Sequence, residues 1–253
     1  MNPLKNFSCT CLIPARMSSS RFPGKPLVMI NDRPLIQHVY DRAKKWEPFG
    51  DQVFVVSPDQ EITDKCSKLG IRSLLTWSSS NDCLDCAAMG IEKLITHNIT
   101  SQRYIIIQGD EPLFDCSILD SVNGSPPISN LYTVSKNSLS DLSNRNVVKV
   151  LVSMHNKAIY FSRYGLPHSH PTTLRKSRPI VLYKQLGIYI FSAASLLQFH
   201  LLPPAVTEDI EGIGLNRLIE NDVSIQMQES NLDCISVDIP SDIPRVIRVL
   251  NGE

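Results

Sequence analysis

The sequence lacks several features by which common classes of protein are recognised. Its 253 residues carry 25 Lys plus Arg and 25 Asp plus Glu, so the net charge gives no reason to expect nucleic acid or a membrane surface as a partner. No apolar run approaches the length of a bilayer span, and the opening residues lack the basic, apolar and small-residue order of a signal peptide. We therefore expect a soluble, cytoplasmic protein.

Familiar metal and nucleotide motifs are missing as well. Cys83 and Cys86 have CxxC spacing, but no second Cys or His pair accompanies them, so the seven cysteines are expected to be reduced thiols. Neither GxxxxGK[ST] nor GxGxxG occurs, which excludes the usual glycine-rich phosphate loops. A DxD metal motif is also absent, because the next aspartate after Asp233 is Asp238, and this argues against a metal-dependent glycosyltransferase.

Short aliphatic runs alternate with longer amphipathic stretches as far as residue 122. The runs predict strands at 8–13, 52–57, 71–75, 104–108, 128–134, 147–153 and 186–191. The amphipathic stretches predict helices at 34–46, 60–69, 82–97, 115–122, 192–200, 208–221 and 240–250. This order predicts an α/β fold with a mainly parallel central sheet flanked by helices. Ligands of such sheets bind beyond the carboxyl ends of the strands, where the segments after Ile13 and Gln108 would both lie.

We expect a single domain over residues 1–253. The segment 162–180 is rich in proline, histidine and cations and poor in apolar residues, which is typical of a long excursion from the sheet. We assign 150–195 to an arm or lid on this basis. A linker between two domains is the alternative, but strands resume at 186 without a second full alternation of helices and strands.

A cationic segment follows the first predicted strand. It is PARMSSSRFPGKP, residues 14–26, with cations at Arg16, Arg21 and Lys25. Gly24 allows the backbone to approach a phosphate closely, and the guanidinium groups suit phosphate oxygens. The segment therefore predicts a triphosphate site, although a solvated loop would have a similar composition.

Carboxylates follow two other predicted strands. Asp110 and Glu111 come directly after the apolar run that ends at Gln108, and Asp238 follows a strand-like segment near the C-terminus. Carboxylates at strand ends suit Mg²⁺, which takes few protein oxygens and completes its shell with water and phosphate. Each could equally be part of an ordinary turn. Because no nucleophile triad is evident, the combination predicts metal-assisted attack on the α-phosphate of a nucleotide.

Seven motifs occur in the order typical of one enzyme family. They are IPARMSSSRFPGKPL, RPLIQHV, QGDEP, NVVKV, YFSR, LGIY and VDIPSD. Over residues 8–250 the chain resembles the sugar-acid cytidylyltransferases, and among them the branch that activates 3-deoxy-manno-octulosonate (Kdo). The resemblance implies a nucleotide-diphospho-sugar transferase fold, Mg²⁺ as cofactor, and a homodimer that uses the 150–195 region. It also implies a role in lipopolysaccharide biosynthesis, in which CTP and the sugar acid give CMP-sugar and pyrophosphate.

The resemblance also implies roles for individual residues. The catalytic residues would be Arg16, Lys25, Asp110 and Asp238, with Asp110 and Asp238 as the metal ligands. The nucleotide would contact Arg16, Ser19, Arg21, Lys25, Ser80, Asn81 and Gln108. The sugar acid would contact Arg21, Gln108, Arg163, Gln185, Tyr189, Glu211 and Arg217.

Three departures from the family pattern leave the sugar acid open. The family's His-x-Ser-Gly-Thr segment is TWSSSNDCLDCA here, in which Ser79, Ser80, Asn81 and Asp82 still offer hydrogen bonds to a cytosine edge. Gln185 replaces a histidine, and Gly214 and Leu215 stand where the family has Glu-Gln. The alternatives are a modified Kdo, a sialic-acid-like or spore-coat-type sugar acid, or a binding protein without activity.

Overall fold

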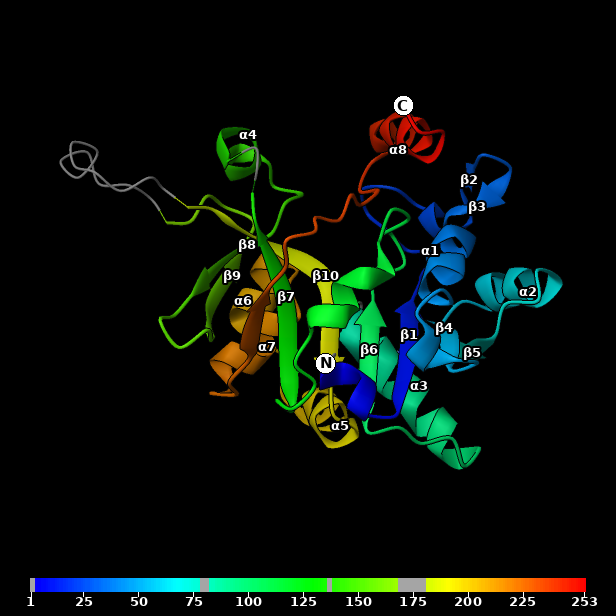
Figure 1. The fold of residues 1–253 in the computed structure, drawn as a ribbon, viewed down its shortest axis with the longest axis horizontal. Helices are drawn as coiled ribbons and strands as arrows, with labels where there is room; N and C mark the ends of the chain where they lie inside the picture. The colour runs from blue at the N-terminus through cyan, green and yellow to red at the C-terminus, as the bar shows by residue number, and fades with distance from the viewer. Residues whose placement is uncertain (1–2, 78–81, 136–137, 168–180) are drawn as a thin grey trace.

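The computed structural model describes residues 3–77, 82–135, 138–167 and 181–253. In these ranges one large sheet forms the centre of the molecule, with strand order β11-β7-β10-β6-β1-β4-β5 (Figure 1). These strands are β1 Cys9–Pro14, β4 Val53–Ser57, β5 Ser73–Leu75, β6 Arg103–Ile107, β7 Ile128–Val134, β10 Tyr183–Phe191 and β11 Gln226–Glu229. Strands β8 Lys149–Val152 and β9 Ala158–Ser162 extend the sheet through β10, and β2 Met29–Ile30 pairs with β3 Arg33–Pro34 in a separate hairpin.

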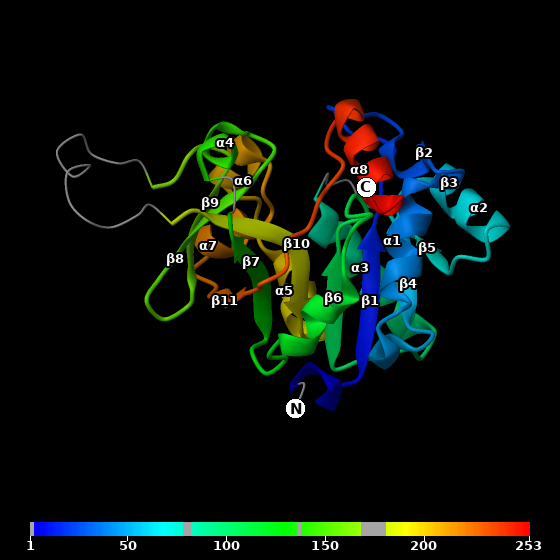
Figure 2. The same cartoon turned by 45° about the horizontal axis from the view of Figure 1, so that its top comes forward.

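Helices cover both faces of this sheet (Figures 1 and 2). The α-helices are α1 Leu35–Ala43, α2 Gln60–Lys68, α3 Cys83–Thr96, α4 Ser138–Ser143, α5 Ala193–Leu201, α6 Val206–Glu211, α7 Leu215–Glu220 and α8 Ile243–Leu250. Short 3₁₀ turns occur at Pro3–Asn6, Lys25–Leu27, Glu47–Phe49, Cys116–Ser121 and Pro240–Asp242. No helix in the described ranges combines the length and the apolar composition needed to cross a bilayer.

Strand β1 shows how the sequence builds this core. All six of its residues are buried, as expected of a parallel strand covered on both faces. Cys11 and Ile13 belong to one apolar cluster with Val39 of α1, and Leu12 belongs to the opposite cluster with Ile91 of α3. Because side chains alternate along the strand, β1 contributes to both apolar clusters, one on each side of the sheet.

The predicted fold class is confirmed. Strand β1 pairs in parallel with β4 and β6, and β4 pairs in parallel with β5, whereas β10 runs antiparallel between β6 and β7. Strands β9 and β11 and helix α4 were not predicted. The predicted helix at 208–221 is two helices, because Gly212 adopts the left-handed conformation at φ 63° and ends α6 there. The predicted helix at 115–122 is a 3₁₀ turn.

The chain's last section crosses the sheet edge to reach the other side of the molecule. From β11 it runs along the edge at which β1 and β6 end and enters α8 (Figure 1). Helix α8 packs beside the β2–β3 hairpin and α1, where Val246 and Val237 share a small cluster with Ile30 and Leu35 (Figure 2). This crossing brings Asp238 to the sheet edge. Residues 168–180 of the predicted arm lie outside the described residues.

A buried arginine joins the helices on one face of the sheet. Arg217 of α7 is 5% exposed at its side chain, and its guanidinium contacts two buried carboxylates. It donates to Glu208 of α6 from Nε at 2.8 Å and Nη2 at 2.5 Å, and to Asp85 of α3 from Nη1 at 3.0 Å and Nη2 at 2.9 Å. His200 of α5 lies 2.9 Å from the same Asp85 carboxylate. The network fixes α3, α5, α6 and α7 relative to one another.

Replacing this arginine should destabilise the fold strongly. In Arg217→Met, Asp85 and Glu208 lose their buried cation, which typically costs about 3–5 kcal/mol of unfolding free energy. The surface variant Arg33→Met is a matched control, because the Arg33 side chain is 60% exposed and its partner Asp41 is 3.3 Å away. We expect the control to lose no more than about 1 kcal/mol in urea unfolding. Equal losses in the two variants would contradict the role given to the network.

Candidate active site

A charged cavity of about 370 Å³ opens at the edge where β1 and β6 end. Six of its lining residues are cations and seven are acids: Arg16, Arg21, Lys25, Arg163, Lys184 and Arg245, with Asp82, Asp110, Glu111, Asp141, Asp233, Asp238 and Asp242. Another hollow, of about 550 Å³, lies beside β7 and β11, but Glu229 is the single charged residue among those that line it. Cations that could bind a polyanionic ligand therefore line the cavity and not the hollow.

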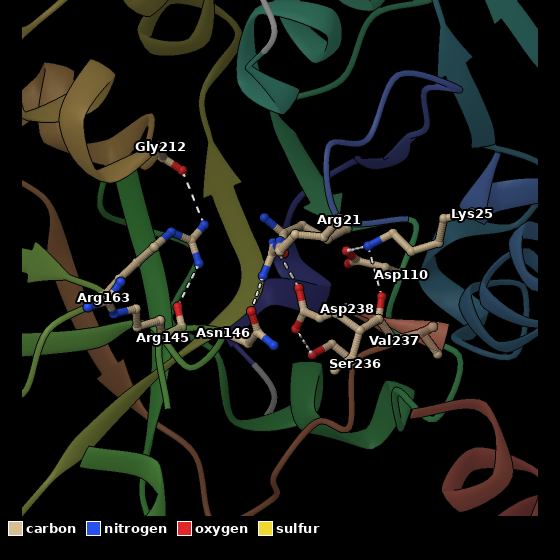
Figure 3. Close-up of polar contacts among 12 residues, drawn as sticks. Arg21, Lys25, Asp110, Arg145, Asn146, Arg163, Gly212, Ser236, Val237 and Asp238 are labelled. Atoms are coloured by element: carbon tan, nitrogen blue, oxygen red, sulfur yellow. Dashed lines mark hydrogen bonds and ion pairs between the residues drawn. The ribbon is translucent and has the colours of Figure 1, made fainter. Parts of the chain in front are cut away.

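The first half of the cavity is built by the cationic segment and the end of β6. Lys25 follows Gly24, which adopts the left-handed conformation at φ 73°. The Lys25 ammonium lies 2.5 Å from Oδ2 of Asp110 and donates to the carbonyl of Val237 at 2.8 Å (Figure 3). At the neighbouring Gly109, a Cβ would lie 2.6 Å from the Pro14 carbonyl, so only glycine allows the two strand ends to approach this closely.

Arg21 joins the cationic segment to the chain's last section. Its Nη2 lies 3.0 Å from Oδ1 of Asp238, and its Nη1 donates to Oδ1 of Asn146 (Figure 3). Ser236 donates to the other Asp238 oxygen at 3.1 Å. Burial, and then the negative charge of Asp110, raise the pKa of Asp238 above its usual value. Asp110 is therefore close enough to Asp238 for its negative charge to oppose the ionisation of Asp238.

Asp110 and Asp238 are brought together through the backbone. The Val237 amide donates to the Asp110 carbonyl at 2.9 Å, which places the residue after it beside Asp110. Oδ1 of Asp110 is buried without a hydrogen-bond partner. Two adjacent carboxylates with an unsatisfied oxygen fit a hard divalent cation that completes its shell with water and phosphate. Within the described ranges, no group of three or more His, Cys, Asp or Glu side chains is placed to hold a metal.

The second half of the cavity is lined by neutral amides and a phenol. Gln108 donates from Nε2 to the Tyr189 hydroxyl at 2.8 Å, and Gln185 donates to the same oxygen at 3.3 Å. Since two donors occupy the phenol oxygen, its own proton is directed to another acceptor. Tyr189 is 4% exposed, and burial raises its pKa well above the ordinary value, so it stays protonated at neutral pH.

Two further acids line the cavity. Glu111 was noted in the sequence as a strand-end carboxylate, and Asp82 as a residue that could bind a cytosine edge. Glu111 is 5% exposed and its Oε2 has no hydrogen-bond partner; burial, followed by the charge of Asp110, raises its pKa to about 8. Asp82 caps α3 by accepting from Leu84 N at 2.7 Å, and burial raises its pKa to about 6. Gly214 packs against Asp82 so closely that a Cβ would lie 2.2 Å from Oδ2.

The structure brings most of the residues predicted by resemblance into one cavity. They are Arg16, Ser19, Arg21, Lys25, Gln108, Asp110, Arg163, Gln185, Tyr189 and Asp238. Ser80 and Asn81 lie outside the described residues. Asn146 was missed as a site residue, although it stands in the motif NVVKV that had already been singled out.

Glu211 and Arg217 are placed differently from the sequence prediction. The Glu211 carboxylate accepts from Ser162 Oγ at 2.6 Å and from the Arg163 amide at 2.9 Å, so it holds the end of β9. Arg217 belongs to the buried network with Asp85 and Glu208, and neither residue lines the cavity. Both residues were assigned to the sugar acid by resemblance to the family; here α6 ends at Gly212, α7 begins at Leu215, and both side chains bind protein groups instead.

Comparisons with known proteins agree with this geometry. The family model described as Cytidylyltransferase matches residues 10–226. The 3-deoxy-manno-octulosonate cytidylyltransferase of Thermodesulfovibrio yellowstonii is 33% identical over 95% of this chain and 97% of its own length. The protein of the same name from Syntrophobacter fumaroxidans is 36% identical over 94% of this chain and 95% of its own length.

Solved structures of nucleotidyltransferases have the same fold as this chain. The structure of CMP:2-keto-3-deoxy-manno-octonic acid synthetase complexed with CTP matches with a TM-score of 0.80 and 27% identity, over 96% of this chain and 98% of that one. A putative glucose-1-phosphate thymidylyltransferase from Bacillus anthracis shares the fold at a TM-score of 0.66 and 13% identity, over 97% of this chain and 96% of that one.

The packing around Gly187 gives a test of the second half of the cavity. An alanine Cβ at this position would lie 2.7 Å from Oε1 of Gln108 and 3.0 Å from Oε1 of Glu111. Gly187→Ala should therefore displace Gln108 from Tyr189 and cost about 1–3 kcal/mol of unfolding free energy. In a double-mutant cycle, Gln108→Ala removes the obstructing amide, so the double variant should lose less than the sum of the two single losses. Additive losses in urea unfolding would refute the contact.

Proposed function

Since the chain belongs to the cytidylyltransferase family, we propose that it transfers the CMP group of CTP to Kdo or a modified Kdo and releases pyrophosphate. The observation that carries this proposal is the meeting of the cationic segment with Asp110 and Asp238 in one cavity. A triphosphate needs concentrated positive charge, and the sugar acid brings a carboxylate as well. The cavity offers cations on both of its halves, from Arg16 to Arg163.

In the reaction we propose, the anomeric hydroxyl of the sugar acid attacks the α-phosphorus. The new P–O bond forms as the bond to the β-phosphate oxygen breaks, and pyrophosphate leaves. Lys25 and Arg16 bind the phosphates and offset the charge that develops on the pyrophosphate. Tyr189, through its remaining proton, and Arg163 orient the sugar acid. No side chain forms a covalent intermediate.

Mg²⁺ is the cofactor we propose, with Asp110 and Asp238 as its protein ligands. When bound, this ion adds positive charge at the phosphate oxygens and lowers the pKa of the attacking hydroxyl. In the free chain the same two carboxylates pair with Lys25 and Arg21. Both cations would exchange these carboxylates for phosphate oxygens when the nucleotide binds, so that each charge keeps a partner.

We also propose a cytoplasmic homodimer, with the 150–195 region as the interface, that supplies an activated sugar for lipopolysaccharide. Large apolar side chains on this region support an interface: Ile159 is 53% exposed, Tyr164 62% and Val181 43%. Surfaces of this kind are commonly covered by a partner.

The direct test uses CTP, Mg²⁺ and a panel of sugar acids that contains Kdo, an amino-Kdo and a sialic acid. The product mass shows which acid has gained CMP, and a pyrophosphate assay gives the rate. A product with the sialic acid alone would replace Kdo as the substrate. Absence of pyrophosphate release with every acid would favour the alternative of a binding protein without activity.

Substitution of the carboxylates tests the mechanism. Asp110→Asn and Asp238→Asn should each lower kcat/KM by at least about 100-fold, because metal-assisted charge stabilisation contributes several kcal/mol. Both should also weaken Mn²⁺ binding in the presence of CTP, as measured by electron paramagnetic resonance. Asp64→Asn, on the exposed face of α2, is the control and should leave both quantities unchanged. Full turnover in both site variants would refute the proposed metal ligands.

A further inference from the structure

Lys149, at the start of β8, is a buried cation that the proposed reaction does not use. It is 0% exposed, and its ammonium donates to three backbone carbonyls. These belong to Asn144 at 2.7 Å, Val147 at 2.9 Å and Arg163 at 2.7 Å. An ammonium has three N–H donors, so all of them are satisfied.

These carbonyls belong to a wall of the cavity. Asn144, Asn146, Val147 and Val148 line it from the segment before β8, and Arg163 lines it from the end of β9. Lys149 is not among the lining residues. The ammonium therefore ties two separate parts of the wall together from behind.

Arg163 extends the same arrangement to a third part of the wall. Its Nη1 donates to the Arg145 carbonyl at 3.1 Å, and its Nε donates to the Glu211 carbonyl at 2.7 Å (Figure 3 shows the first of these). Its Nη2 lies 3.4 Å from the carbonyl of Gly212, which begins the cavity-lining turn 212–215. Two cations thus set the backbone of this wall through carbonyl oxygens.

The Asn146 side chain connects the wall to the cationic segment. Oδ1 of Asn146 accepts from Nη1 of Arg21, and Nη2 of Arg21 pairs with Asp238 (Figure 3). A shift of residues 144–148 would therefore move Arg21, which lies between the phosphate half and the sugar half of the cavity.

From this geometry we propose that Lys149 is a positioning residue for the sugar acid: its ammonium holds the 144–148 segment and Arg163 at the distance that lets Asn146 and Arg163 face the substrate. The proposal rests on the proposed function for the identity of that substrate. Lys149 contacts no reacting atom and acts only through the wall that it holds.

Burial has a measurable effect on this ammonium. It lowers the pKa of Lys149 to about 8, against the smaller opposing effect of Asp141. The charge of Arg163 lowers the pKa of Lys149 further, and the charge of Glu211 raises it. Lys184 of β10 lies opposite Lys149 where β10 and β8 pair. Below pH 8 the charged ammonium donates a hydrogen bond to each of the three carbonyls. Above pH 8 the neutral amine has two donors and a lone pair, so one carbonyl loses its partner.

The kinetic test compares Lys149→Met with Lys149→Arg. Loss of hydrogen bonds from a charged donor should raise the KM for Kdo by about 10- to 100-fold in Lys149→Met. The KM for CTP should change by less than about threefold, because Arg21 is one of three cations in the cationic segment and the other two, Arg16 and Lys25, keep their places. Lys149→Arg retains a charged donor and should recover a large part of the loss. Equal increases of both KM values, or no increase, would overturn the proposal.

The pH profile separates positioning from a merely structural role. In the native protein the KM for Kdo should rise above pH 8, whereas in Lys149→Arg this rise should be absent, because a guanidinium does not titrate there. Glu111, with its pKa of about 8, is present in both proteins, so the difference between the two profiles belongs to Lys149. Identical profiles would overturn the proposal.

Hydrogen exchange gives a readout that does not depend on activity. After correction for intrinsic rates, the backbone amides of residues 144–148 in the native protein should lose protection above pH 8, and they should be less protected in Lys149→Met at pH 7. Protection that is unchanged in both cases would overturn the proposal even in an active enzyme. If no sugar acid is activated, the proposed function fails, and the exchange data still decide whether Lys149 holds the wall.

Discussion

The pairing of two cations with two carboxylates holds the cavity together. Lys25 and Arg21 come from the segment after the first strand, Asp110 follows the fourth strand of the main sheet along the chain, and Asp238 comes from the section that leads to the last helix. Residues more than 200 positions apart in the sequence therefore meet at one edge of the sheet. Opposite charges at this distance are strongly attractive when partly shielded from water, and they prepare an edge at which phosphate oxygens and a divalent ion can take over the same partners.

The backbone makes this meeting possible. The close approach of Gly109 to Pro14, the left-handed turn at Gly24 and the amide of Val237 on the Asp110 carbonyl leave the side chains little freedom of position. Behind the cavity, Arg217 with its two carboxylates and Lys149 with its three carbonyls hold the helices and loops that form the walls. Arg217 and Lys149 are thus buried charges that hold the scaffold, whereas Arg163 both lines the cavity and binds the backbone of its wall.

The phosphate half of the site could be predicted from sequence because it lies in short continuous motifs directly after strands. Arg16 and Asp110 each come within three residues of the end of an apolar run, Lys25 lies in the same motif as Arg16, and the α/β topology then fixes where they go. The sugar half was harder to predict. Arg217 and Glu211 were assigned to the sugar acid by resemblance to the family. In the structure α6 ends at Gly212, and both side chains bind protein groups that lie far from them in the sequence or are set by the local turn, which sequence spacing does not reveal. Lys149 stands in the motif NVVKV, but its role could not be predicted, because a buried lysine that donates to main-chain oxygens leaves no pattern in the side chains around it.

The direction of β10 has a consequence for how such an enzyme can diversify. Because this strand runs opposite to β6, its beginning rather than its end reaches the cavity, and it carries Gln185, Gly187 and Tyr189 there. Under the proposed function, the nucleotide tail and the second substrate would therefore contact different stretches of polypeptide, with Arg21 and Gln108 at the boundary. Substitutions at the start of β10, such as glutamine for the family's histidine at position 185, could change which sugar acid binds without changing the residues that contact the departing pyrophosphate. The residues that would activate the nucleotide can therefore change independently of the residues that would select the sugar acid.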